Sequence, residues 1–320
     1  MAQTANVLDT YLSRNQREQI YDKIYNVDRE ETPFLSAIRK IAGTAVTFEW
    51  QTDSLEAANA GNALEEARVF SATPTQATTR LSNHMQISGK SFSISNTQEK
   101  VNKAGMRSEV RTQFLKKLAE LKRDVDAALL ANQAKVVRNP STNTVGRLAG
   151  IGSWITTNTS AGVGGVDPTG DGTDARTDGA IRPLTENLFN DVIQSMLSNS
   201  GKKPTVAYMG AKSIRVAGGF TGVSQHTVQT GRNEKVYAVS AVNIYITPIG
   251  AIRFEFEPNM RARDVLITNP DMWASVVLRR FEESTDDTAA DAKIVSITHE
   301  HTLMCGNEKA SGLVADVETT

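Results

Sequence analysis

Several features that mark secreted, membrane-spanning or disulfide-stabilised proteins are scarce in this sequence. Its 320 residues include one cysteine, Cys305, so no disulfide can form within the chain and stability must come from packing and assembly. A run of about 18 apolar residues is also lacking, which excludes a transmembrane helix. The first residues do not show the basic-then-apolar pattern of a secretory signal. We therefore expect synthesis in a reducing cytosol and no membrane partner.

An excess of positive charge is lacking as well. Lys plus Arg total 35 and Asp plus Glu total 36, which gives a formal net charge of −1. Proteins that grip duplex DNA by neutralising phosphates usually carry a basic excess. If DNA is a neighbour, we expect this protein to enclose it rather than to read its sequence. The hydrophobic share of 39% and the charged share of 22% are ordinary for a folded chain.

Residues that carry chemistry are few, with only four histidines in the chain. The Gly-Lys-Ser sequence at 89–91 matches the end of a phosphate-binding loop, but His84 stands where that loop needs a further glycine. His299 and His301 lie on one face of a predicted strand, yet zinc needs a third ligand and none stands at a recognisable spacing. We interpret the Gly-Lys-Ser sequence as part of a strand, and His299 and His301 as a solvated or interface pair.

A loop rich in Gly, Thr and Asp at 152–183 is predicted to be an exposed insertion or a mobile loop. Its acidic part, 167–178, resembles a calcium loop in composition, but Asp178 stands where an EF-hand has its bidentate glutamate. A nucleophile elbow of the form Gly-x-Ser-x-Gly is absent. We expect no catalytic residue, no cofactor and no metal, and we leave open whether 167–178 binds a cation. A hydrolase or nucleotide-binding enzyme stays as the alternative from another class.

Alternating apolar residues predict an extended β-hairpin in the first third of the chain. Residues 44–50 alternate as a half-buried strand does, and residues 81–94 alternate again with a change of phase after Gly89, which predicts a bulge. The long polar stretch 51–80 between them offers no core of its own, so the hairpin needs a neighbour. The apolar hairpin residues that we expect another chain to cover are Val46, Phe48, Leu81 and Ile87.

The clearest helix is predicted at 96–137, where apolar residues recur every three or four positions from Val110 to Leu129. Gly105 weakens its first turns by about 1 kcal/mol, which favours a break there. At about 1.5 Å per residue the segment would span roughly 60 Å, which suits a strut better than a compact enzyme core. The remaining predicted elements are helices at 184–197 and from Ser213, and strands at 205–209, within 236–256, and at 265–267, 274–278 and 294–303.

Two blocks of residues resemble the major capsid proteins of tailed bacteriophages. The first block holds Arg17-Glu18, Ile20, Asp22, Ile24, then Glu31-Thr32-Pro33-Phe34 and Glu49-Trp50-Gln51-Thr52-Asp53-Ser54-Leu55. The second holds Tyr245-x-Thr247-Pro248-x-Gly250-x-Ile252-x-Phe254, Asp264-Val265-Leu266, Arg279-Arg280 and Glu300-x-Thr302-Leu303. Two stretches depart from the family pattern: Glu65-Glu66 replaces an acidic residue followed by glycine, and the acidic run 282–287 replaces a Leu-rich turn. Both are predicted to be loops, so they affect subunit contacts more than the fold.

The resemblance implies an α+β protein with the Hong Kong 97-type capsid fold. Its expected parts are an N-terminal arm (1–42), an extended β-hairpin loop (43–94), a peripheral domain with a long spine helix (95–150 and 282–304) and an axial domain (151–281 and 305–320). The residues that we expect at subunit interfaces are Leu12, Ile24, Val46, Phe48, Glu65, Glu66, Arg68, Leu81 and Ile87.

The resemblance also implies a function, that of a major capsid protein. Copies of the chain would form pentamers and hexamers that close into an icosahedral shell around double-stranded DNA, without sequence-specific binding. The expected location is the virion, after assembly in the host cytoplasm. A portal protein is an expected partner, and the need for scaffolding or decoration proteins stays open. An encapsulin-like compartment is the alternative within the same fold.

Overall fold

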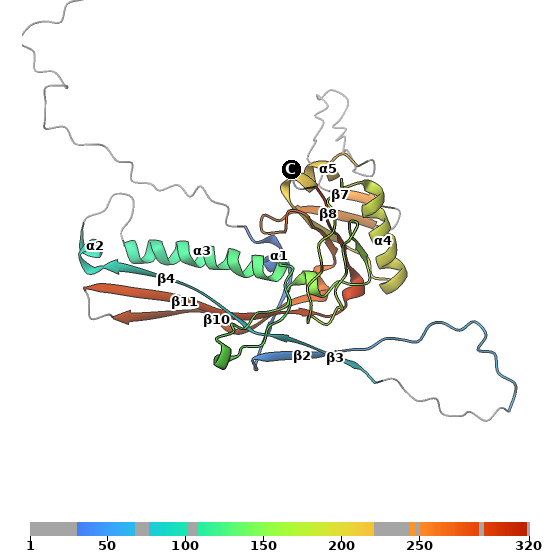
Figure 1. The fold of residues 1–320 in the computed structure, drawn as a ribbon, viewed down its shortest axis with the longest axis horizontal. Coiled ribbons are helices and arrows are strands. Elements are labelled where there is room, and N and C mark those ends of the chain that lie inside the picture. Colours follow the sequence, from blue (N-terminus) through green and yellow to red (C-terminus); the bar gives the residue numbers. More distant parts are fainter. Residues whose placement is uncertain are drawn as a thin grey trace, which may run out of the picture.

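The chain folds into an elongated part, a compact part and a projecting hairpin. The computed structural model describes residues 31–67, 77–101, 108–220, 244–247, 250–287 and 291–318. In Figure 1 the elongated part holds helix α3 (Glu109–Leu130) alongside strands β4 (Gln86–Ser95), β10 (Trp273–Asp287) and β11 (Ala292–Cys305). The compact part holds α4 (Glu186–Ser200) and α5 (Ala211–Ala217), and the hairpin consists of β2 (Thr47–Thr52) and β3 (Thr79–His84). This architecture confirms the predicted α+β class.

A four-stranded sheet and the spine helix α3 form the elongated part. Strand order is β1 (Arg39–Ala42), β10, β11, β4, with β1 parallel to β10 and the other pairs antiparallel. The Ser108 hydroxyl accepts a hydrogen bond from the Arg111 backbone N–H and caps α3. Leu121, Val125 and Leu129 turn into the core, so the predicted apolar stripe faces the interior over the second half of the helix. A separate short helix, α2 (Asn96–Lys100), follows β4.

The helix predicted at 96–137 is therefore interrupted, and it also ends earlier than expected. The chain from Ala131 onward leaves the helix and pairs with a later loop, where the Gly150 N–H donates to the Gln133 carbonyl at 3.0 Å. Gly150 approaches so closely that an added Cβ would lie 2.1 Å from the Ala131 carbonyl oxygen. Tertiary hydrogen bonds thus override the helical pattern beyond Leu130.

A six-stranded sheet forms the compact part. Its strand order is β5 (Thr159–Ser160), β12 (Ser311–Val314), β9 (Val265–Thr268), β6 (Val206–Met209), β8 (Gly250–Phe256) and β7 (Ile244–Thr247). Helix α4 packs Phe189, Val192 and Met196 against it, all of them buried. The Thr185 hydroxyl caps α4 by accepting from the Leu188 N–H, and Gly201 ends the helix with a left-handed φ of 62°. Short 3-10 turns lie at Pro140–Thr142, Ile151–Ser153, Pro270–Met272 and Glu308–Ala310.

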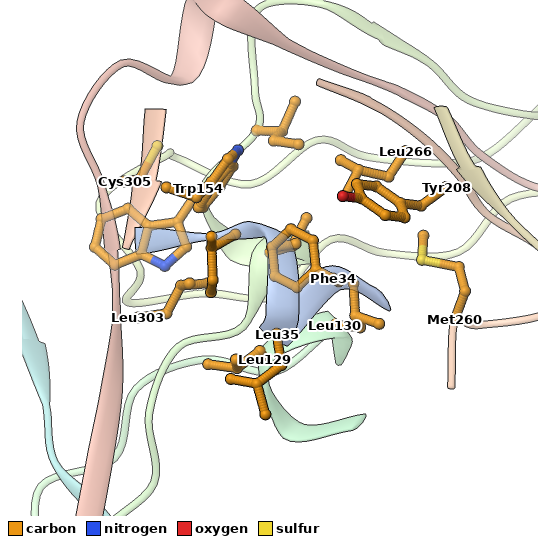
Figure 2. Close-up of a cluster of buried hydrophobic side chains, with 14 of the residues drawn as sticks. Phe34, Leu35, Leu129, Leu130, Trp154, Tyr208, Met260, Leu266, Leu303 and Cys305 are labelled. Atoms are coloured by element: carbon orange, nitrogen blue, oxygen red, sulfur yellow. The ribbon is translucent and has the colours of Figure 1, made fainter. Parts of the chain in front are cut away.

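The two parts share one hydrophobic core at their junction, shown in Figure 2. Helix α1 (Pro33–Ala37) inserts Phe34 there, edge-on to Tyr208 at 5.5 Å between ring centroids. Leu129 from α3 and Leu303 from β11 lie in the same cluster as Leu266 from β9, so it contains residues from the elongated part and the compact part. The elongated and compact parts are therefore held together by buried apolar contacts rather than by a surface seam.

The hairpin is shorter than predicted. β2 pairs with β3 from Thr47 opposite His84 to Thr52 opposite Thr79, and the chain then enters β4, which pairs with β11. The predicted second strand, 81–94, is thus two strands that belong to two different sheets. The phase of burial changes at the junction of Met85 and Gln86, and β4 runs past Gly89 in continuous register, so the predicted bulge was wrong.

Two stretches predicted to be loops have different structures. The acidic run 282–287 lies within β10 and pairs with Lys293–Thr298 of β11. The segment 152–183 contains almost no strand, but it buries Ser153, Trp154, Ile155 and Asn158 in the core. The prediction of an exposed or mobile insertion at 152–183 was therefore wrong, because these side chains are packed.

Candidate assembly surfaces

The base of the hairpin is anchored on its own subunit. Trp50 is buried, with its ring centroid 5.2 Å from that of Trp154, and Phe48 stacks on Trp50 at 6.1 Å. Phe48 and Leu81 pack against the junction core. The expectation that only another chain covers these two residues was therefore wrong, because they pack on their own subunit. Both are only partly buried, so a place at a subunit interface stays a prediction for them.

The part of the hairpin beyond the paired strands has no such support. Every residue from 53 to 67, which we call the outer hairpin segment, is exposed, and Leu55 retains 99% of its accessible surface. Its acidic residues are Asp53, Glu56, Glu65 and Glu66, and it contains no lysine or arginine. Its side-chain hydrogen bonds are local, from Ser54 N to Asp53 and from Gly61 N to Asn59. Glu65 and Glu66 are thus accessible to another chain.

Two further candidates share a concave surface near the hairpin base. Val46 and Ile87 are 61% and 49% exposed, and with Met85 and Val145 they line a groove of about 470 Å³. This hairpin-base groove also includes Glu300, which forms an ion pair with Arg279 at 3.0 Å. The candidates Leu12, Ile24 and Arg68 lie outside the residues that the structure describes.

A second groove, of about 380 Å³, lies where α1, α3 and the four-stranded sheet meet. We call it the cationic groove. Its apolar lining includes Leu35, Ile41, Ala42, Val277 and Phe281, and its polar lining includes Thr32, Ser36, Ser275 and His299. Lys40, Lys122 and Arg280 also line it, and no carboxylate does. Within the described part of the chain, none of these three cations is in an ion pair with a carboxylate.

His299 belongs to this groove but carries no charge in the neutral range. Its ring stacks between Phe281, at 4.1 Å, and His301, at 5.0 Å. Burial lowers the pKa of His299 to about 4, and burial together with the neighbouring His299 lowers the pKa of His301 to about 3. Among the described residues, no group of three His, Cys, Asp or Glu side chains is placed to hold a metal ion.

A buried network of ion pairs fixes the loop that resembled a calcium site. The Arg176 side chain is fully buried, and its Nη2 lies 2.9 Å from Asp264 Oδ1 while its Nη1 lies 3.4 Å from Asp316 Oδ2. Asp178, at the position of the EF-hand glutamate, accepts contacts from Arg176, Arg261 and Arg263. Three guanidinium groups therefore engage the carboxylate that a calcium ion would need, which points to a structural role for Asp178.

Two buried carboxyl groups hold the start of the described chain. The Phe34 N–H donates to Glu257 Oε2 and the Leu35 N–H to Asp126 Oδ1, each at 2.9 Å. Asn259 Nδ2 donates to Asp126 Oδ2 at 2.9 Å. Burial and the charge of Asp126 raise the pKa of Glu257 to about 8, so this carboxyl keeps a proton at neutral pH. Sequence reasoning missed this pair, although Asp126 directly follows Val125 on the buried side of α3.

The family model for the SU10 major capsid protein matches residues 3–318 of the chain. The chain belongs to the SU10 major capsid protein family. The earlier resemblance to tailed-phage major capsid proteins is thereby confirmed. None of the helices in the described ranges is long and apolar enough to cross a membrane.

Similarity to individual proteins agrees with this membership. The major capsid protein of Escherichia phage Phieco32 is 33% identical over 106 residues, which cover 33% of this chain and 30% of that protein's length. Among solved structures, the capsid of a native GTA particle aligns with a TM-score of 0.64 at 12% identity, over 97% of this capsid protein and 98% of that chain. The SrpI encapsulin of Synechococcus elongatus PCC 7942 aligns with a TM-score of 0.58 at 7% identity, over 98% of this chain and 97% of that chain. These alignments confirm the Hong Kong 97-type fold, which phage capsids and an encapsulin share.

Proposed function

We propose that this capsid protein is the repeating subunit of a closed shell around double-stranded DNA. The observation that carries the proposal is the outer hairpin segment, which is exposed along its whole described length and includes the leucines Leu55 and Leu64. Apolar side chains on a segment without a core of its own gain free energy only when another surface covers them. Contacts between different surfaces of identical subunits produce rings and, with closure, shells.

The parts of the subunit can be assigned provisional roles on the same basis. We assign residues 1–42 to an arm, whose last part, α1 and β1, packs in the junction core and in the four-stranded sheet of its own subunit. We assign residues 43–84 to the hairpin loop, ten residues shorter than the sequence predicted, because β4 pairs with β11. The elongated part would then be the peripheral domain and the compact part the axial domain. The near-neutral net charge of −1 supports a wall that encloses DNA without binding it tightly.

The test is to express the chain alone and to measure its assembly by sedimentation velocity, with electron microscopy of the fast fraction. Closed shells, or discrete pentamers and hexamers, would support the proposal. If only monomers or dimers sediment at every salt and protein concentration, coexpression with a scaffolding protein, and then with portal and decoration proteins, comes next. Monomers under all of these conditions would overturn the proposal.

An encapsulin-like compartment is the second candidate, because a solved encapsulin shares the fold over nearly its whole length. The two functions differ in what the shell contains. Shells purified from infected cells should hold DNA that survives external nuclease if the protein is a viral capsid. A protein cargo at fixed stoichiometry in place of DNA would favour the compartment.

A further inference from the structure

We propose that the cationic groove binds a small phosphate monoester, with the phosphate among the cations and the apolar part of the molecule on the groove floor. The proposal does not depend on shell formation, because every residue that carries it lies in one subunit. A hollow of about 380 Å³ is within the size range of small-molecule sites. Its lining combines apolar side chains with a few polar and charged ones, as such sites usually do.

The cations of the groove come from three different elements. Lys40 belongs to β1, Lys122 to α3 and Arg280 to β10, and all three are exposed. No carboxylate lines the groove, whereas the hairpin-base groove includes Glu300. His299 adds no positive charge at neutral pH, because burial lowers its pKa to about 4. An anion that enters the groove would therefore relieve the repulsion between like charges.

The pairing of β1 with β10 places polar and apolar lining residues on one face of the sheet. Lys40 pairs with Ser275 and Ala42 pairs with Val277, and all four line the groove. Alternate side chains of a strand point to the same face. Ser275 and Val277 therefore direct a hydroxyl and an apolar side chain into the same hollow, next to the lysine of the neighbouring strand.

The Ser275 hydroxyl is a buried polar group that the subunit leaves without a partner. Ser275 is 1% exposed, and its Oγ has no hydrogen-bond partner among the described residues. A buried hydroxyl in this state is unfavourable, and a ligand oxygen in the groove would accept its hydrogen bond. Three cations and one hydroxyl match the three terminal oxygens and double charge of a phosphate monoester better than the two oxygens and single charge of a carboxylate.

An irregularity in β10 places an aromatic ring beside a cation in the groove. The pairing of β10 with β11 shifts register twice between Val277 and Glu282. Consecutive side chains of a regular strand point to opposite faces, yet Arg280 and Phe281 both line the groove. His299 stacks on the Phe281 ring with 4.1 Å between centroids. A ligand that joins a phosphate to a compact apolar body fits this arrangement.

Titration calorimetry of the full-length chain with three probes tests the site. Phenyl phosphate carries both parts of the expected ligand, inorganic phosphate carries only the anion, and phenol carries only the ring. Phenyl phosphate should bind at least about tenfold more tightly than inorganic phosphate, because its ring covers the apolar floor. Phenol should show no measurable binding. Added salt should weaken the binding of phenyl phosphate, because the three cations are exposed.

Substitutions in the groove locate the binding. Lys122→Ala with Arg280→Ala should weaken the binding of phenyl phosphate by about tenfold or more. Lys203→Ala removes an exposed lysine after α4 and is the matched control, with unchanged affinity. Ser275→Ala should weaken binding by about threefold, yet it should leave the Tm of the unliganded chain unchanged or higher, because the hydroxyl has no partner among the described residues. Thermal unfolding of each variant also shows whether the chain still folds.

Several results would overturn the proposal. It is wrong if phenyl phosphate binds no more tightly than inorganic phosphate, or if the variant with both cations removed binds phenyl phosphate as well as the wild type does. If a short DNA duplex binds through Lys122 and Arg280 while phenyl phosphate does not bind, the groove takes nucleic acid instead. A lower Tm for Ser275→Ala would contradict the role given to its hydroxyl. None of these results depends on whether shells form, so the proposed function is tested separately.

Discussion

The compact part and the outer hairpin segment represent two different uses of the same chain. In the compact part, every residue of β6, β9 and β12 is buried, and Arg176, Arg261 and Arg263 have carboxylate partners within hydrogen-bonding distance. In the outer hairpin segment, every residue from 53 to 67 is exposed and apolar side chains lie in water. The burial and ion pairing of the compact part are explained by the stability of one subunit. The outer hairpin segment has no comparable contribution to that stability, so its composition is better explained by contact with another chain.

The largest expected effect comes from breaking the compact part at its buried charge. Arg176→Ala should lower the free energy of unfolding by about 3–5 kcal/mol, because Asp264 and Asp316 would lose a buried partner. Urea unfolding of the monomer measures this change. Arg253→Ala is the control: its ion pair with Glu255 is largely exposed, so the loss should stay below about 1 kcal/mol. Equal losses would mean that the buried network is not what stabilises this part.

A smaller effect is expected from overfilling the contact between α4 and the six-stranded sheet. A Cβ added at Gly312 would lie 2.4 Å from Val192 Cγ1 and 2.9 Å from Met196 Sδ, so these side chains or α4 itself must shift. Gly312→Ala should therefore destabilise the subunit by about 1–3 kcal/mol, measured by thermal unfolding. Gly210→Ala should be nearly neutral, since the nearest atom to its added Cβ is 4.0 Å away. A neutral Gly312→Ala would show that the Val192 and Met196 side chains, or α4, can move aside at little cost.

The junction between the parts should respond to pH. The folded-state pKa of Glu257 is raised to about 8 from an ordinary value of 4.5, so its contribution to stability is present at low pH and is lost as pH rises through 8. The pKa values of His299 and His301 are lowered to about 4 and about 3 from 6.5. Their contribution to the free energy of unfolding is therefore lost as pH falls below 6.5, and it does not change above that pH. Between pH 6.5 and 8 the free energy of unfolding should therefore fall, and Glu257→Gln should flatten that slope. If the Glu257→Gln variant shows the same pH dependence of the free energy of unfolding as the wild type, the group that titrates between pH 6.5 and 8 is not Glu257.

The smallest effect on the monomer should come from the outer hairpin segment. Leu55→Ser should change the free energy of unfolding by less than about 0.5 kcal/mol, because the side chain contacts nothing that it could lose. The same variant should reduce shell formation in sedimentation. Val163→Ser removes another exposed side chain, from the compact part, and should leave both measurements unchanged. A destabilised Leu55→Ser monomer would contradict the comparison between the two regions.

Local signals in the sequence predicted the elements whose ends are set locally. Thr185 and Gly201 bound α4 by hydrogen bonds and backbone geometry within a few residues, and the predicted 184–197 lies within three residues of the observed ends. The strand at Val265–Thr268 was likewise visible as a short apolar run. In both cases the residues themselves carry the information.

Predictions failed where a distant partner decides the structure. The sequence of 81–94 alternates throughout, and only the pairing of β4 with β11 divides it between two sheets. The acidic residues 282–287 have weak strand propensity, yet β11 supplies them with a complete ladder. The sequence likewise did not reveal that Phe48 and Leu81 pack partly against the core of their own subunit. Glu65 and Glu66 stay predictions that assembly experiments must test.

The single cysteine, Cys305, can report how often the junction core opens. Cys305 lies at the end of β11 within the shared core, and burial raises the pKa of its thiol well above the ordinary range. A thiol reagent can reach it only while the two parts transiently separate. The rate of labelling in free subunits, compared with that in finished shells, would therefore report how often the junction core opens before and after the shell closes.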